Sequence, residues 1–133
     1  MSTRPLPQPT AETRPFWEGC TLGELRYQAC ADCGRVQPIP RSCCQHCQSS
    51  ALQWRASAGR GRILSHTTVH RAPTPAFREL APYVIALVDL DEGFRLMVNL
   101  AGGEQPGLAI GAPVRIGFCT VDGVALPQAE LLP

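Results

Sequence analysis

Paired cysteines are the residues of this sequence whose types and spacing most clearly indicate chemistry. Five of the seven cysteines fall between Cys30 and Cys47, and four of them form two Cys-x-x-Cys pairs, Cys30/Cys33 and Cys44/Cys47. Each pair presents two thiolates to one point, and two such pairs complete a tetrahedral site without an open position. That ligand set is typical of a structural zinc ion. We therefore predict one Zn²⁺ bound by Cys30, Cys33, Cys44 and Cys47.

Three alternatives to this zinc site stay open at the level of sequence. One is a redox-active Cys-x-x-Cys, although two such motifs occur and no βαβ pattern surrounds them. Another is iron in the same four-thiolate cage. The third is Cys43, which stands beside Cys44 and offers a spare thiol, but only Cys44 gives the two-residue spacing to Cys47. We therefore expect Cys43 not to coordinate the metal.

A second group of polar residues, from Ser65 to Arg71, offers hydroxyl and imidazole side chains. A hydrolase or transferase could use His66 or His70 as a base for a serine nucleophile. Adjacent residues on a strand point to opposite faces, however, which separates Ser65 from His66. We keep a hydrolase or transferase as an alternative function and expect these residues to be ordinary polar positions of a strand.

The composition excludes several function classes. The chain has 133 residues, with twelve basic residues, all arginine, against eleven acidic ones, for a net charge of +1. Without lysine it can form neither a Schiff base nor the lysine of a P-loop. The near-neutral charge gives no electrostatic reason to expect a nucleic-acid partner, although a single-strand-binding module stays an alternative. With no signal peptide and no apolar run of about 18 residues, we predict a cytoplasmic protein that binds no membrane.

Short extended segments surround the cysteines and must bring them together. They cover residues 25–28, 35–39 and 52–54. Longer runs rich in β-branched residues follow and predict strands over residues 62–70, 83–90, 94–100 and 113–121. Asp91-Glu92-Gly93 predicts a hairpin turn, and the proline-rich residues 71–82 predict a long loop of functional importance. Four or five short antiparallel strands predict a small barrel, for which the OB-fold is the commonest size match.

These patterns divide the chain into three parts, in a fold that is mainly β. Residues 1–14 are polar and proline-rich and are predicted to form a disordered tail. Residues 15–58 hold a short helix followed by the zinc ribbon, and residues 59–133 hold the OB-fold. The helix and the ribbon are too small to be stable alone, so each needs a surface on which to pack.

A series of short motifs runs through most of the chain in a recognisable order. It comprises Phe16-Trp17, Cys30-x-x-Cys33-Gly34, Pro40-Arg41 before Cys44-x-x-Cys47, Gly59-x-Gly61, Ser65-x-Thr67-Thr68-Val69-His70-Arg71, Pro82-Tyr83-Val84, Asp91-Glu92-Gly93 and Ile110-Gly111-x-Pro113-Val114. The series resembles a family long called a domain of unknown function. That family combines a short N-terminal helix, a rubredoxin-like zinc ribbon and an OB-fold, and it is associated with acyl-CoA metabolism.

The resemblance implies an accessory subunit whose chemistry lies on its partner. Members of the family typically stand beside thiolase-fold proteins and are required for their activity, in acyl transfer, acyl-CoA condensation or retro-aldol removal of steroid side chains. The expected partners are therefore a thiolase-like protein and an acyl-CoA. An independent acyl-CoA hydrolase or transferase that uses His66 or His70 is the alternative function. Large aromatic residues are common interface anchors, so Phe16 and Trp17, with the ribbon, are the expected partner interface. Packing of Trp17 on the barrel of its own chain is the alternative.

Candidate residues for binding acyl-CoA lie at the start of the barrel and in the long loop. Arginine binds phosphate in a bidentate manner. We therefore expect Arg60, Arg62 and Arg71 to contact the phosphates or the adenine of coenzyme A, with His70 beside them. Phe77 would border the apolar arm of the carrier. The alternative is that these arginines are solvated at the edge of the barrel and bind no ligand.

Overall fold

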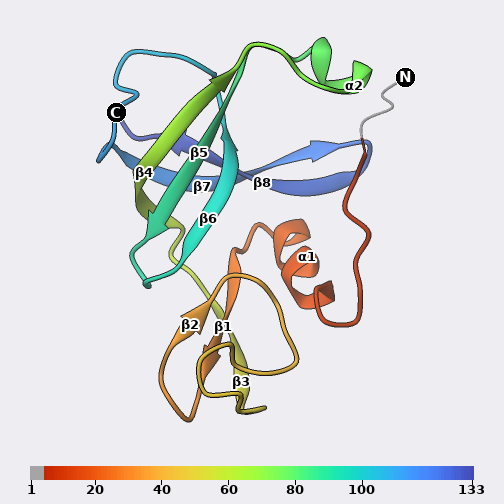
Figure 1. The fold of residues 1–133 in the computed structure, drawn as a ribbon, viewed down its shortest axis with the longest axis vertical. Helices are drawn as coiled ribbons and strands as arrows, with labels where there is room; N and C mark the ends of the chain where they lie inside the picture. Colours follow the sequence, from red (N-terminus) through yellow and green to blue (C-terminus); the bar gives the residue numbers. More distant parts are fainter. Residues whose placement is uncertain (1–4) are drawn as a thin grey trace.

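The computed structural model describes residues 5–133 as two small β-structures, with the first helix packed beside both (Figure 1). Of the predicted disordered tail, residues 1–4 lie outside the described residues, and residues 5–13 carry no helix or strand. The disorder of this tail stays a prediction. Within the described residues no helix is long and apolar enough to cross a membrane.

The first β-structure is a three-stranded antiparallel sheet that follows a helix. The bounds of these elements are α1 (Arg14–Thr21), β1 (Arg26–Cys30), β2 (Val36–Gln37) and β3 (Leu52–Ala56). The strand order is β2-β1-β3. The three strands confirm the extended segments predicted around the cysteines, and we call residues 26–56 the ribbon. β1 lies in the middle of the sheet, and only its first residue is not fully buried.

The second β-structure is a closed five-stranded barrel, which confirms the predicted OB-fold. The bounds of its elements are β4 (Arg60–Val69), α2 (Pro75–Arg78), β5 (Tyr83–Leu90), β6 (Arg95–Leu100), β7 (Pro113–Val121) and β8 (Val124–Leu131). Its strand order is β4-β5-β6-β8-β7. The predicted hairpin turn joins β5 to β6: Gly93 adopts a φ of 101° and donates its backbone N–H to the carbonyl of Leu90 at 2.9 Å.

Strand β8 has no counterpart in the sequence prediction, because Pro127 interrupts its pattern and a proline within a run argues against a strand. The structure shows why this proline is tolerated. Leu132 donates its N–H to the carbonyl of Pro113, and bonded pairs recur at every second residue of an antiparallel ladder. In the register of β7 with β8, the bonded pairs therefore include Leu126 and exclude Pro127. The nitrogen of Pro127 faces away from β7, where no N–H is needed.

One hydrophobic core joins the helix, the ribbon and the barrel. Phe16 and Cys20 of α1 and Tyr27 of β1 belong to the same cluster of buried residues as the barrel strands. The ring of Tyr27 stacks on that of Phe94, with ring centroids 4.8 Å apart. The helix packs between β1 and β8. The ribbon thus lacks a separate core and is stabilised by burial against the barrel, as its small size requires.

A carboxylate at the tip of the β5–β6 hairpin fixes the linker between the ribbon and the barrel. Glu92 accepts hydrogen bonds from the hydroxyl of Ser57 at 2.7 Å and from the backbone N–H of Ala58 at 2.8 Å. The same hydroxyl accepts the N–H of Gly59, which has a φ of 73°. The turn sequence therefore has a second function, because its carboxylate holds the connection to the metal-binding half of the molecule.

Candidate metal centre and surrounding surface

The four predicted cysteine ligands come together at the end of the ribbon. The sulfur atoms of Cys30, Cys33, Cys44 and Cys47 all lie within 4.8 Å of one another. The Cys30 and Cys47 sulfurs are 3.5 Å apart, and the Cys33 and Cys44 sulfurs are 3.6 Å apart. A tetrahedron with Zn–S bonds of about 2.3 Å has S–S edges of about 3.8 Å. Donor type and spacing therefore fit one tetrahedral metal ion, whereas the neighbouring Cys43 is exposed and outside the group.

The two cysteine turns repeat the same backbone geometry, which aims both pairs of sulfurs at one point. In the first, Gly34 has a φ of 77° and donates its N–H to the carbonyl of Cys30 at 2.9 Å. In the second, Gln48 has a φ of 63° and donates to the carbonyl of Cys44 at 2.9 Å. Only the first turn has a glycine at its positive-φ position, so the sequence did not predict that the second turn has the same geometry.

Backbone N–H groups lower the pKa of two ligand thiols. The pKa of Cys44 falls to about 6, mainly through hydrogen bonds from the backbone of Cys47 and His46. The pKa of Cys30 is also lowered, mainly by the backbone N–H of Cys33. For Cys47 a backbone hydrogen bond lowers the pKa, but the neighbouring thiols of the cluster and burial together raise it by more, so that the pKa of Cys47 reaches about 12. The pKa of Cys47 lies above those of Cys30 and Cys44 because like charges at such short distances repel one another, so the thiolates of one cluster cannot all form equally easily.

Two buried glutamines hold the second cysteine turn against the sheet. Gln37 is 2% exposed and Gln28 is 4% exposed. The side-chain amide of Gln37 donates to Oε1 of Gln28 at 2.7 Å, and its own Oε1 accepts the backbone N–H of Gln45 at 3.0 Å. Gln28 exchanges two hydrogen bonds with the backbone of Arg41, each of 3.0 Å. Sequence reasoning missed both residues, since glutamine in a short strand is usually exposed.

Replacement of Gln37 by leucine is expected to weaken metal binding about 10- to 100-fold while leaving the four ligands in place. The variant keeps similar side-chain volume but leaves the N–H of Gln45 without its acceptor, and loss of such supporting hydrogen bonds typically lowers metal affinity by that factor. Competition with a chromophoric chelator measures the affinity. Gln45→Ala is the matched control, because only the backbone of Gln45 takes part; equal affinities of all three chains would contradict the assignment.

The aromatic residues predicted as partner anchors differ in their placement. Phe16 is 9% exposed and belongs to the core, where its ring meets that of Trp17 edge-on at 4.9 Å. Trp17 is partly buried against the same core. It also lines two cavities, one of about 370 Å³ beside the N-terminal segment and one of about 260 Å³ between β6 and β8. Of the two residues, Trp17 is therefore the one that reaches the surface.

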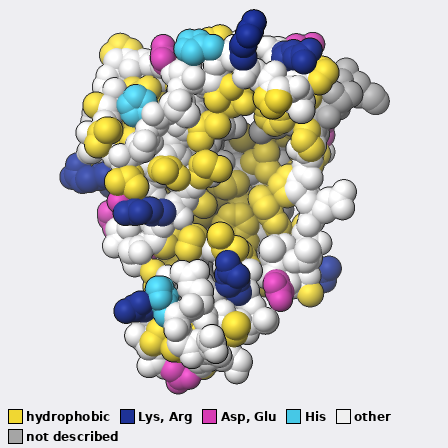
Figure 2. Space-filling model, in the orientation of Figure 1, with side chains coloured by type: hydrophobic (Ala, Val, Ile, Leu, Met, Phe, Trp, Pro, Cys, Tyr) yellow, Lys and Arg dark blue, Asp and Glu magenta, His cyan; other side chains and the backbone are white. Residues whose placement is uncertain are grey.

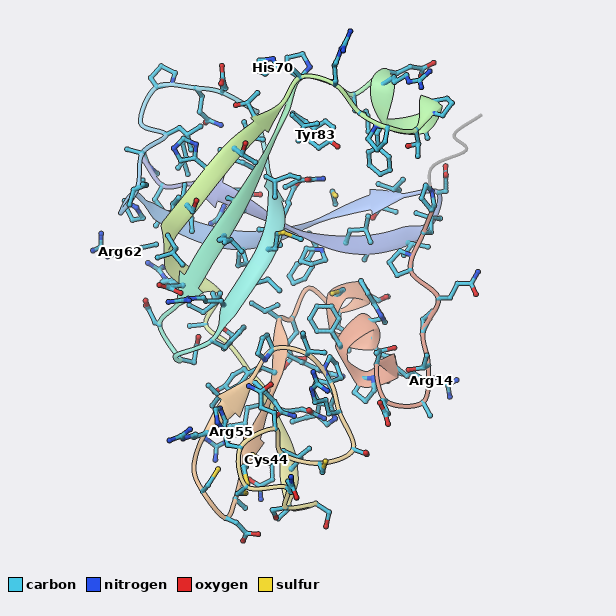
Figure 3. The ribbon with its side chains drawn as sticks, in the orientation of Figure 1. Arg14, Cys44, Arg55, Arg62, His70 and Tyr83 are labelled. Carbon is cyan, nitrogen blue, oxygen red and sulfur yellow. The ribbon has the colours of Figure 1, made fainter. Side chains whose placement is uncertain are left out.

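The residues predicted to bind acyl-CoA divide into two groups. Arg60 and Arg62 are exposed at the start of β4, where Arg62 donates to the carbonyl of Gly111 at 3.0 Å. His70 and Arg71 follow the other end of the same strand, as Figure 3 shows for Arg62 and His70. The ten residues of β4 extend for roughly 30 Å at about 3.3 Å per residue. The two groups therefore do not form one compact site.

The group at the far end of β4 borders a cavity of about 510 Å³. Its lining includes His70, Arg71 and Arg78 and contains no acidic residue. Arg78, at the end of α2, was not predicted, because the proline-rich loop gave no signal for a helix. The ring of the predicted Phe77 lies 6.1 Å from that of Tyr83. This end of the barrel therefore combines cationic side chains with nearby aromatic surface.

The face shown in Figure 2 is hollowed and lined by hydrophobic side chains between β6, α1 and α2. Trp17, Met97 and Leu126 line the apolar cavity of about 260 Å³ between β6 and β8. Met97 is 68% exposed, and Leu87, its partner across β5 and β6, is 36% exposed. Exposed apolar surface of this kind, gathered in a hollow, is typical of a binding surface.

The polar residues of β4 do not form a catalytic pair. The hydroxyl of Thr68 donates to Glu104 at 2.6 Å. Among the hydrogen bonds of residues 5–133, none joins a serine or threonine hydroxyl to a histidine, and the ring of His46 contacts Arg35 instead. The histidine-based hydrolase or transferase therefore gains no geometric support.

Comparisons with known proteins identify the family of both the ribbon and the barrel. Residues 17–53 match the family model described as ChsH2, rubredoxin-like zinc ribbon domain, and residues 54–118 match ChsH2, C-terminal OB-fold domain. A DUF35 domain-containing scaffold protein of Methanothermobacter thermautotrophicus is 33% identical over 95 residues, which cover 71% of each chain. The chain belongs to the ChsH2/DUF35 family. The resemblance inferred from the motifs is thereby confirmed.

Two further proteins similar to this ChsH2/DUF35 chain have names that state an enzymatic activity. A chain of a solved structure, the Ltp2-ChsH2(DUF35) aldolase, superposes with a TM-score of 0.82 at 33% identity and covers 95% of this chain and 98% of that chain. The 3-oxo-4,17-pregnadiene-20-carboxyl-CoA hydratase alpha subunit of Mycobacterium tuberculosis is 38% identical over 112 residues. Those residues cover 84% of this chain but only 35% of the hydratase subunit, so the chain spans about a third of that relative.

In this ChsH2/DUF35 chain, the thiols outside the metal site are expected to differ sharply in reactivity. Cys20 is 1% exposed, and burial raises the pKa of its thiol to about 11. At pH 8 it therefore holds almost no thiolate, the reactive form. Iodoacetamide should modify the exposed Cys43 first and Cys20 only after unfolding, as followed by mass spectrometry of tryptic peptides. Early modification of Cys20 in the folded chain would contradict its placement in the core.

Proposed function

We propose that this ChsH2/DUF35 chain is a non-catalytic accessory subunit of a thiolase-like acyl-CoA complex, which transfers, condenses or cleaves acyl groups as in steroid side-chain degradation. The observation that carries the proposal is the superposition of nearly the whole chain on a chain of the Ltp2-ChsH2(DUF35) aldolase. The similarity to the alpha subunit of a CoA-thioester hydratase supports an acyl-CoA as the ligand.

The metal in this proposal is one zinc ion with a structural role. Four cysteine sulfurs surround the site and leave no open ligand position, which distinguishes structural from catalytic zinc. Cys30, Cys33, Cys44 and Cys47 would hold the ion, and its binding free energy would stabilise a ribbon that has no core of its own. In a reducing cytoplasm, thiols remain available for such a site.

The carrier-binding part of the proposal concerns the cavity at the far end of β4. Arg71 and Arg78 border it, and His70 lies beside them. Neither guanidinium forms an ion pair within the described residues, so both are free to receive phosphate oxygens. Phe77 would border the apolar part of the carrier. The separation of Arg60 and Arg62 from this cavity makes them a natural comparison rather than part of the same site.

The partner surface in this proposal is the apolar hollow of Figure 2, together with Trp17 of α1, which lines the apolar cavity between β6 and β8. An aromatic side chain that is half buried in its own core and half exposed to a hollow can anchor a partner without a large loss of side-chain entropy. Phe16 would support Trp17 from the core. The thiolase-like partner would cover the exposed Met97 and Leu87 on the same face.

Reconstitution tests this function. The untagged chain is purified from its native cell together with any thiolase-like partner, and acyl-CoA turnover is measured for the chain, the partner and the complex. We expect no turnover by the chain alone and full activity only in the complex. Replacement of both Arg71 and Arg78 by alanine should raise the KM for acyl-CoA about tenfold and leave kcat within about twofold, because binding of a remote group is lost.

The comparison variant replaces Arg60 and Arg62 by alanine and is expected to leave KM within about twofold. A larger rise of KM in this variant would place the carrier at the start of β4, as the sequence first suggested. Turnover by the isolated chain would instead favour the independent hydrolase or transferase and would contradict an accessory role.

A further inference from the structure

The barrel is closed between β6 and β8 by a very short seam. These two strands run parallel and pair only at Asn99 with Gln128 and Leu100 with Ala129. The N–H of Ala101 adds one bond to the carbonyl of Ala129 at 2.8 Å. The first four residues of β6 and the first four of β8 have no pairing with each other, and the apolar cavity of about 260 Å³ lies in this gap.

The hydrogen bonds at the β5–β6 turn fix which residues of β6 face the gap. Leu90 donates its N–H to the carbonyl of Phe94 at 2.9 Å. Bonded pairs recur at every second residue of an antiparallel ladder, so Leu96 and Val98 of β6 also bond to β5. Arg95 and Met97 therefore point their N–H and C=O groups away from β5 and into the gap.

These outward backbone groups have no hydrogen-bond partner among residues 5–133, and β6 pairs there only with β5 and, at its end, with β8. The opposite wall of the gap is different, because Pro127 of β8 has no N–H and α1 packs on that strand. Exposed strand edges are usually protected by charge, proline or cover. Met97 itself carries no charge, and the nearest charge on this edge, that of Arg95, is paired with Asp89 at 2.6 Å.

We propose that this edge of β6 receives an extended segment of the partner protein as an added strand. Met97 and Arg95 would provide two N–H and two C=O groups to the backbone of that segment. Alternate side chains of the segment would enter the cavity lined by Trp17, Leu126 and Pro127, and they would be apolar because its lining carries no charged residue. The inference rests on the proposed function, which supplies the partner.

The size and shape of the site favour a segment over a second copy of this chain. Stable interfaces bury about 1,200–2,000 Å², whereas this edge offers two residues and a cavity of about 260 Å³. β6 also borders the hydrophobic hollow of Figure 2, beside which a single further strand could lie. A narrow strand held by a partner that binds elsewhere fits both features.

Backbone amide exchange of the isolated chain, followed by NMR, is the first test. The amides of Arg95 and Met97 should exchange quickly, while those of Leu96 and Val98, bonded to β5, should exchange slowly. Slow exchange of Met97 in the isolated chain would show that its edge is already paired and would overturn the inference.

The same amides are then followed in the complex with the thiolase-like protein that co-purifies with the chain. We expect exchange at Arg95 and Met97 to slow at least tenfold. If the complex forms and both amides stay fast, the added strand is refuted while the accessory function stands. If the wild-type chain binds no thiolase-like protein, the proposed function is refuted and the inference falls with it.

Two variants at one position separate the backbone from the side chain. Met97→Pro removes an N–H that β5 does not use, whereas Met97→Ala removes the same side chain and keeps the N–H. We expect the proline variant to bind the partner at least tenfold more weakly than the alanine variant. Equal affinities would overturn the inference. Slow exchange at Leu96 and Val98 checks that the proline variant folds, and the wild-type exchange data decide the matter if it does not.

Discussion

Replacement of Cys44 by serine is expected to abolish metal binding and to unfold the ribbon. Metal binding to sites of this kind is worth roughly 10–16 kcal/mol, which is as large as the roughly 5–15 kcal/mol of net free energy that stabilises a whole domain. The structure extends the expectation to the barrel, because Tyr27 of the ribbon stacks on Phe94. Unfolding of the ribbon would expose the ring of Phe94 to solvent and would therefore lower the Tm of the barrel as well. Circular dichroism during heating measures both effects.

Elemental analysis of the same preparations identifies the ion. We expect one zinc per wild-type chain and none in Cys44→Ser. Cys43→Ser is the matched control, since its sulfur lies outside the cluster and is exposed. It should bind one zinc and melt like the wild type. Iron in place of zinc, or a folded wild-type chain without metal, would refute the structural zinc site.

Replacement of Gly61 by alanine is expected to cost about 3 kcal/mol of stability and to lower the Tm by roughly 10 °C. A Cβ at this position would lie 2.3 Å from the carbonyl oxygen of Asp89 and 3.0 Å from its carbonyl carbon. Both are backbone atoms of the paired strand β5, so neither can move without shifting the β4–β5 ladder. Urea unfolding at constant pH measures the change.

Gly117→Ala is the control for this effect, because it also adds a Cβ in a crowded place on a barrel strand. There the nearest atom, at 2.6 Å, is Oε1 of Glu130, the end of a flexible side chain. The carboxylate can turn aside, so we expect less than about 1 kcal/mol of destabilisation. Equal losses for the two variants would show that the close approach of β4 to β5 is not what requires glycine at Gly61.

The sequence allowed prediction of those features in which local chemistry dictates the structure. The spacing of Cys30, Cys33, Cys44 and Cys47 requires two tight turns around one point, and the structure contains them. The turn at Gly93 could be predicted because glycine readily adopts a positive φ, and the barrel could be predicted from short runs of β-branched residues. The same logic failed at Pro127, because whether a proline fits a strand depends on which way its nitrogen points, and that is fixed by pairing with a distant strand.

Long-range contacts explain the other omissions. Gln28 and Gln37 are polar residues whose burial depends on the loop that folds over them, so neither pattern nor propensity could identify them. Arg78 lines the candidate phosphate cavity because α2 lies beside the end of β4, a contact that the sequence pattern does not indicate. The predicted arginine site is divided into two groups because Arg62 and Arg71, although close in sequence, lie toward opposite ends of the extended strand β4.

The packing of α1 against β8 has a consequence for the order in which the molecule assembles. The two elements span residues 14–21 and 124–131, so roughly a hundred residues are synthesised between them. The metal ligands, by contrast, all lie between residues 30 and 47. During translation the cysteine turns can close around a metal long before the helix has the surface on which it finally packs. Contacts between such distant segments form slowly, so a metal-bound ribbon would form before α1 can pack on β8.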